Sequence, residues 1–187
     1  MLNDEFGKSV TVIDTLTGGS GGTIINDYAS NLASAGVSYD DIVKKIIEVR
    51  SRLLTSFYIS KVEGFVSSGR APKEARLLDK LSFRYRIDIN SSGKLYPKLP
   101  PYRGDIKKEF IKYLKNIVND NNKTLYDPNY FTLLVTGLKE IDIDDAKTYL
   151  ESLNYFDVSL IKELPFYGVI SAYGVEDQVG IALIKKK

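Results

Sequence analysis

The residues best suited to contact a ligand gather in the last stretch of the chain, where a polar loop separates two apolar runs. The first run, 166–172, leads into a loop that contains Tyr173, Gly174, Glu176 and Asp177, and a second run follows it. A phenol, a glycine and two carboxylates between buried segments are typical of a ligand site, because such sites often lie on loops held by a rigid scaffold. The alternative is a turn that joins two core segments.

The chain contains no His and no Cys, and this narrows its chemistry more than any motif does. Histidine is the commonest general acid or base and the commonest metal ligand. Without these residue types, Ser-His and Cys-His nucleophiles, disulfides and the usual zinc sites are excluded. Paired carboxylates, a Ser-Lys pair or a magnesium site remain open. We therefore expect a protein that is not an enzyme and that carries no cofactor.

Two further motifs each allow two interpretations. Four glycines occupy the five positions from Gly18 to Gly22. Such a turn either cradles phosphate on its N–H groups or lets a helix pack closely on a sheet, and it matches neither common phosphate-binding motif. Asp142, Asp144 and Asp145 resemble part of a calcium loop but lack its Gly and its terminal Glu. Acids also stabilise the first turn of a helix, and the sequence favours that interpretation.

Positive charge is concentrated in the middle of the chain. Residues 70–115 carry 13 Lys or Arg against 5 Asp or Glu, whereas the remainder carries 13 against 19. This asymmetry suggests an anionic partner or ligand, and a solvated helix face is the alternative. Interleaved tyrosines at 85, 96, 102 and 113 would suit nucleic-acid stacking. No RNA-binding motif accompanies them, so we do not expect nucleic acid as the partner.

Length and hydropathy fit a soluble domain. The 187 residues suffice for one domain, or for one domain and part of another. No apolar run approaches the roughly 20 residues needed to cross a bilayer. The first residues, MLNDEFGKS, carry acids where a signal peptide carries basic charge. We expect a cytoplasmic protein without a membrane span.

The pattern of apolar residues predicts an α/β (α+β-like) fold, with helices packed on a mixed β-sheet. Strict alternation over 83–89, followed by the turn Asn90-Ser91-Ser92-Gly93, predicts a β-hairpin whose Arg84, Arg86 and Asp88 face outward. Strands are also predicted at 10–15, 55–60, 130–137, 156–164 and 179–184. Helices are predicted at 23–35, 39–54, 61–68, 72–81, 105–119 and 143–153.

Five stretches carry a family resemblance in their order along the chain. They are VIDT with its Gly-rich turn, EGFVSSGRAP, NSSGKLYP, YRGDIKKEFIKYL and ISAYGVEDQVGIALI. In this order and spacing they resemble the second half of the DegV family of lipid-binding proteins. The resemblance implies a DegV C-terminal-like α/β domain at 55–187. It also implies a strand and two helices at 1–54 as the remnant of the family's N-terminal Rossmann-like domain.

The resemblance also implies a function. Such proteins bind a fatty acid in an apolar tunnel, and some present its carboxylate to a partner kinase that makes an acyl phosphate. Here Tyr173 stands where the family has a His, and a phenol still donates a hydrogen bond. Glu176 and Asp177 depart from the family's glycine-rich loop and would repel a carboxylate if they faced it. The implied ligand-binding residues are Tyr173, Ser171, Gly174, Arg70 and Gly69, and the implied partner-binding residues are Arg103, Lys107 and Lys108.

The alternative is a non-enzymatic interaction or oligomerisation subunit that has lost the ligand. An exposed edge of the predicted 10–15 strand would then support a homodimer or pairing with a separate first-half protein.

Overall fold

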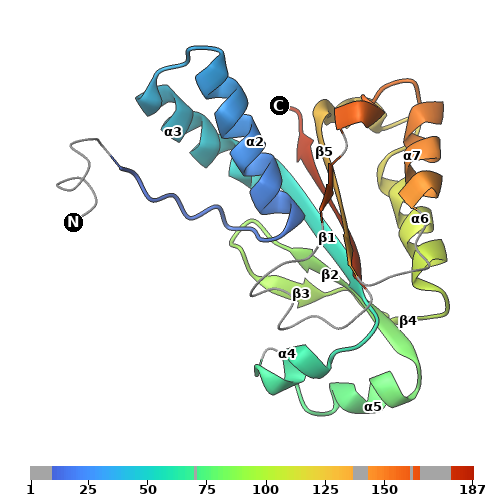
Figure 1. Cartoon of the computed structure of the whole chain (residues 1–187). Coiled ribbons are helices and arrows are strands. Elements are labelled where there is room, and N and C mark those ends of the chain that lie inside the picture. Colours follow the sequence, from blue (N-terminus) through green and yellow to red (C-terminus); the bar gives the residue numbers. More distant parts are fainter. Residues whose placement is uncertain (1–9, 70, 137–142, 161, 165–177) are drawn as a thin grey trace.

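The computed structural model describes residues 10–69, 71–136, 143–160, 162–164 and 178–187 (Figure 1). Its strands form a mixed sheet in the order β3-β2-β1-β7-β5-β6, and β4 also pairs with β2. Neighbouring strands are antiparallel except β5 and β6, which are parallel. The mixed α/β fold predicted from the sequence is confirmed. The strands are β1 (Leu53–Ile59), β2 (Phe83–Ile89), β3 (Leu95–Pro97), β4 (Tyr102–Arg103), β5 (Tyr126–Thr136), β6 (Lys162–Leu164) and β7 (Gln178–Lys185).

The helices cover the sheet on both faces (Figure 1). Alternation along β1 places Phe57 and Ile59 on one face and Tyr58 on the other. On the Phe57 face, α2 (Ser20–Ser34) and α3 (Tyr39–Val49) pack at one end, and α4 (Glu63–Ser67) and α5 (Ala75–Lys80) pack at the other. On the Tyr58 face lie α6 (Ile106–Ile117) and α7 (Ile143–Ser152). In the described part of the chain, no helix is both long and apolar enough to cross a bilayer.

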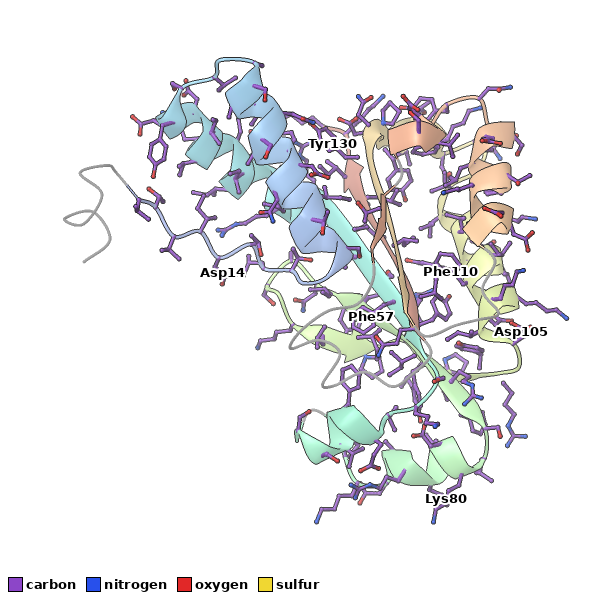
Figure 2. The ribbon with its side chains drawn as sticks, in the orientation of Figure 1. Asp14, Phe57, Lys80, Asp105, Phe110 and Tyr130 are labelled. Carbon is purple, nitrogen blue, oxygen red and sulfur yellow. The ribbon has the colours of Figure 1, made fainter. Side chains whose placement is uncertain are left out.

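The cluster under α6 and α7 contains many of the most deeply buried side chains. Phe110 and Leu114 of α6 and Leu150 of α7 are at most 2% exposed and belong to one cluster with Ile181 of β7. Figure 2 shows Phe110 between α6 and the sheet. Helix α6 begins where its sequence predicts, because the Asp105 carboxylate accepts hydrogen bonds from the N–H groups of the first turn. Such a cap satisfies donors that the helix itself leaves unpaired. The amphipathic helix predicted at 105–119 is therefore confirmed.

The Gly-rich stretch runs into the first turn of α2, which begins at Ser20 rather than at the predicted residue 23, and lies close to β1. A Cβ atom on Gly21 would lie 2.1 Å from Thr17 Oγ1 and 2.6 Å from Thr55 Oγ1, so only a glycine fits. The two threonine hydroxyls are themselves hydrogen-bonded at 3.1 Å. This geometry supports the close-packing interpretation of the turn rather than phosphate binding.

The strand predicted at 10–15 is wrong. These residues are described, and they form no strand. Tyr39 Oη donates to Thr11 Oγ1, Arg50 donates to the carbonyl of Asp14, and Val12 is 90% exposed. A β-branched sequence becomes a strand only where a neighbouring strand offers hydrogen bonds, and the described residues supply none here. The exposed strand edge on which the dimer hypothesis relied is therefore not formed.

Two other predicted elements change at their ends. The helix predicted to reach 54 ends at Val49 and continues as a 3₁₀ turn, η1 (Arg50–Arg52), because β1 begins at Leu53. The strand predicted at 156–164 is wrong over its first half, which contains the 3₁₀ turn η3 (Val158–Leu160). The Asp157 carboxylate accepts hydrogen bonds from Ser159 N and Ser159 Oγ, and such a local side-chain bond favours a turn over a strand.

Candidate functional site

Most of the ligand-binding residues predicted from the sequence lie outside the described residues. Ser171, Tyr173, Gly174 and Arg70 belong to this group, so their roles stay predictions. Gly69 is described. It closes α4 with a φ of 72°, and its N–H donates to Val66 O.

The described neighbours of these residues approach the same end of β1. Gln178, the first residue of β7, is 2% exposed and pairs with Ile59, the last residue of β1. Helix α4 begins only four residues after Ile59, and Ala71, which follows the closing turn of α4, packs on its cluster. The described residues Gln178 and Ala71 therefore lie at the part of the sheet that α4 and α5 cover.

An apolar layer separates α4 and α5 from the sheet, and we call it the α4/α5 layer. It joins two strands to two short helices that have little stability of their own. Ala75 and Leu78 of α5 pack on its margin. Its buried members are Phe57, Ile59, Val62, Phe65, Val66, Tyr85 and Ile87.

Two polar atoms at the α4/α5 layer are buried without a partner in the described residues. They are the hydroxyl oxygen of Tyr85 and Oδ1 of Asp79. The other oxygen of Asp79, Oδ2, accepts a hydrogen bond from Val62 N at 2.8 Å, at the start of α4. Burial raises the pKa of both groups, and the Asp79 charge raises that of Tyr85 further. Unpaired buried groups cost free energy, so a hydrogen-bonding partner would stabilise both of them.

On the opposite face, sequence reasoning missed a packed polar cluster. Arg86 and Asp88 were predicted to face outward from a half-exposed strand, but their side chains are only 24% and 14% exposed. The Arg86 guanidinium lies 4.2 Å from the ring centre of Tyr113 and pairs with Asp88 at 3.1 Å. The Tyr113 hydroxyl contacts Ser56 Oγ at 2.7 Å, and burial raises the pKa of Tyr113 to about 12. Strict alternation could not reveal that α6 covers this face as well.

Three of the four interleaved tyrosines of the basic segment are packed against other side chains, whereas Tyr96 is exposed. Tyr85 and Tyr113 are 5% and 9% exposed, and Tyr102 packs edge-on against Tyr58 with ring centres 5.5 Å apart. This burial counts against the nucleic-acid hypothesis.

The predicted partner-binding residues separate into two places. Arg103 lies over the ring of Phe83, 4.3 Å from its centre. Lys107 and Lys108 line a groove of about 780 Å³ along α6, together with Lys112 and Lys115. Lys107 also pairs with Asp145 of α7 at 2.9 Å. The groove thus carries a surplus of positive charge, although Arg103 does not line it.

The acidic cluster follows its helix-start interpretation where it is described. Asp144 and Asp145 lie in the first turn of α7, and Asp142 lies outside the described residues. Within the residues that the structure describes, no group of three or more acidic side chains is placed to hold a metal ion.

Comparison with known proteins gives a consistent result. Residues 1–186 match the model of a family described as uncharacterised proteins of the DegV family. A DegV domain-containing protein of Lactococcus lactis is 24% identical over 164 residues, which are 86% of this chain and 54% of that protein. Another, from Clostridium perfringens, is 24% identical over 63% of this chain and 41% of its own length. The chain thus spans about half the length of these relatives.

Solved structures share the fold along nearly the whole chain. A DegV family protein from Eubacterium eligens loaded with heptadecanoic acid superposes with a TM-score of 0.81 at 16% identity, covering 99% of this chain and 64% of that one. The Streptococcus pneumoniae Fatty Acid Kinase B3 protein loaded with linoleic acid gives 0.80 at 21%, covering 99% and 63%. A fatty acid binding DegV family protein from Streptococcus agalactiae gives 0.72 at 19%, covering 100% and 64%.

Proposed function

The chain belongs to the DegV family, and from this premise we propose that it binds a fatty acid whose acyl chain enters the α4/α5 layer. Structural relatives with this fold are described as loaded with heptadecanoic acid or linoleic acid. Because this chain spans less than two thirds of their length, ligand binding by this chain is itself part of the proposal.

The observation that supports the proposal is the apolar composition of the α4/α5 layer. Phe65 and Val66 of α4 face Phe57 and Ile87 of the sheet, so an inserted chain would meet apolar atoms on both sides. Burial of each methylene contributes about 0.8 kcal/mol. The covering helices have only five and six residues, so displacing them requires little reorganisation.

Native mass spectrometry and lipid extraction of the purified chain test the proposal. We expect a co-purified fatty acid. Val66→Trp should expel it, because Val66 is 7% exposed within the layer. Leu77→Trp is the matched control, since Leu77 lies on α5 but is 62% exposed. Circular dichroism checks that both variants fold. A ligand-free chain, or a folded Val66→Trp variant that keeps its fatty acid, would contradict the proposal.

We propose that the carboxylate end of the ligand lies near Tyr173, Ser171 and Gly174, and beside Gly69 and Arg70. The supporting geometry is that Gln178 and Gly69, which adjoin these residues in sequence, both lead to the α4 end of β1. Tyr173→Phe removes one hydroxyl and should weaken fatty-acid binding about tenfold. Tyr39→Phe, on the exposed part of α3, is the control. Equal affinities of Tyr173→Phe and the parent would argue against this placement.

We further propose that the protein presents its ligand to an acidic partner, such as a kinase, that docks along the groove of Lys107 and Lys108. The groove carries four lysines, and charge complementarity favours an acidic surface. Lys108→Glu should slow acyl-phosphate formation by a purified fatty acid kinase without releasing the bound fatty acid. Lys44→Glu, a 76% exposed side chain on α3, should not. Unchanged kinetics for Lys108→Glu would exclude this docking surface.

A further inference from the structure

A second, smaller pocket lies at the start of β1, away from the α4/α5 layer. Its volume is about 190 Å³, and its lining includes Arg52, Leu54, Asp88, Tyr96 and Lys185. Since a liquid water molecule occupies about 30 Å³, the pocket accommodates a group of a few heavy atoms but no acyl chain. It therefore calls for a ligand different from the one proposed above.

Arg52 lines this pocket, and the Nε edge of its guanidinium makes no hydrogen bond with the described residues. Its Nη1 donates to the carbonyl of Lys185 at 2.8 Å, on the other edge of the group. Its Nε is buried and has no hydrogen-bond partner in the described residues. Nη2 lies 4.0 Å from Glu48 Oε1, which is too long for a hydrogen bond. Nε–H and Nη2–H point the same way and together match two oxygens of one anion.

The acids near the pocket are already engaged by other cations. Asp88 pairs with Arg86 at 3.1 Å and with Lys98 at 3.6 Å. Glu48 pairs with Lys187 at 2.7 Å, and the hydrogen bond from Lys187 lowers the pKa of Glu48. Because these carboxylates are neutralised, the charge of Arg52 leaves the pocket attractive to an anion.

Beside Arg52, the first residues of β1 have no neighbouring strand on the β2 side among the described strands. The register of β2 on β1 begins at Thr55 opposite Ile89, whereas β1 itself begins at Leu53. Leu53 and Leu54 therefore have no partner strand on that side among the described strands, and both line the pocket. Main-chain groups of an unpaired strand edge hydrogen-bond readily to an incoming polar group.

We propose that this pocket binds a small oxyanion, a carboxylate or a phosphate group, through the Nε and Nη2 edge of Arg52. The Glu48 carboxylate would compete with the anion, because a change of its rotamer would bring it to the same Nε and Nη2 edge of Arg52. None of the buried members of the α4/α5 layer and none of the residues of the α6 groove line this pocket, although Ile89, which does line it, packs against the margin of that layer.

Nuclear magnetic resonance of the arginine Nε–H groups provides the direct test. The full chain is titrated with inorganic phosphate and, separately, with sodium acetate at constant ionic strength. We expect one saturable shift, at Arg52. Saturation by phosphate alone assigns a phosphoryl ligand, and saturation by acetate identifies a carboxylate ligand. No saturable shift with either anion at millimolar concentration overturns the proposal.

Matched variants separate this site from general charge attraction. Arg52→Lys keeps the charge but loses the fork and should weaken binding about tenfold. Arg50→Lys is the control in the same 3₁₀ turn, because Arg50 donates to Asp14 and does not line the pocket. Glu48→Gln should tighten binding about threefold by removing the competing charge. Equal affinities for the two lysine variants would overturn the proposal.

A last control distinguishes the two ligand sites. Val66→Trp should lose fatty acid yet keep the Arg52 shift. If purified chain carries no fatty acid but still binds the anion, the fatty-acid proposal fails and this one stands.

Discussion

Two pairs of helices that cover opposite faces of the sheet differ in how firmly they are held. On the Tyr58 face, α6 and α7 have 12 and 10 residues, and α6 begins with a side-chain cap from Asp105. At the far end of the other face, α4 and α5 have five and six residues, and neither has a side-chain cap from its own N-cap residue. Figure 1 shows this pair at the foot of the molecule, apart from α6 and α7.

The difference indicates which cover stabilises the fold and which can yield to a ligand. Helices of one or two turns are marginal on their own, so α4 and α5 depend on the layer beneath them. Glu63 of α4 also pairs with Arg76 of α5 at 2.7 Å, on the exposed side. Functional sites draw on regions of low local stability. This difference supports the proposed ligand entry at α4 and α5 and assigns the stabilising core to the cluster under α6.

The largest expected effect compares two buried phenylalanines. Phe110→Ala, under α6, should lower the free energy of unfolding by about 3–5 kcal/mol, because Phe110 is 2% exposed in a core that cannot collapse. Phe65→Ala, in α4, should cost clearly less, since its short helix can settle onto the space left behind. Urea unfolding midpoints measure both. Equal losses would remove the proposed difference between the two covers.

The next effect concerns the side-chain cap of α6, which α4 and α5 lack. Asp105→Ala should cost about 1 kcal/mol, because it leaves two first-turn N–H groups without their acceptor. Asp105→Asn keeps an acceptor oxygen and should retain most of this stability. Thermal unfolding of both variants decides the matter. A similar loss in both would show that charge, rather than capping, matters at this position.

The pH dependence of the α4/α5 region has two components of opposite sign. The pKa of Glu63 is lowered to about 2, mainly by the hydrogen bond from Arg76. Its contribution to stability is therefore present above its ordinary pKa and is lost as the pH falls toward 2. Asp79 has its pKa raised by burial, so its contribution is present at low pH and is lost as the pH rises through the folded value. Unfolding from pH 2 to 7 should show Glu63→Gln flattening the acid limb and Asp79→Asn flattening the upper limb. A parental profile in Asp79→Asn would mean that Asp79 is not buried as described.

The smallest effect should come from the outer side of α5. Leu77→Ser should change stability by less than about 0.5 kcal/mol, because Leu77 is 62% exposed. Fatty-acid content should also stay unchanged. Loss of the ligand in this variant would move the proposed entry from the α4/α5 layer to the outer surface of α5.

The strand predicted at 83–89 and the predicted start of the helix after Ser38 are confirmed, and both have local causes. The hairpin at 83–89 has a strict alternation and a four-residue turn, and β2 spans Phe83–Ile89. The helix after Ser38 has a cap whose oxygen accepts from Asp41 N. Such signals act within a few residues, so one sequence suffices to read them. The strand predicted at 10–15 depended on a neighbour elsewhere in the chain, and this dependence is invisible in its own six residues.

The candidate site likewise includes residues that the sequence predicted and a residue that it did not. Gly69 and the lysines of α6 were named from the sequence, and the structure places them at the end of α4 and along a groove. Sequence reasoning did not single out Arg52, because no residue near it in the chain distinguishes it from Arg50. The Arg52 guanidinium donates to the carbonyl of Lys185, 133 positions away, and its Nε has no partner among the described residues.

The amino-acid sequence by itself determined the class of fold, the capped helices, the hairpin and the exclusion of histidine and cysteine chemistry. These follow from residue types and from short-range hydrogen bonds and periodicity. Only the tertiary structure decided that Arg86 is covered, that Val12 is exposed and that Arg52 lines a pocket beside β1. Burial and charge pairing depend on segments far apart along the chain, so they exist only once the sheet has brought those segments together.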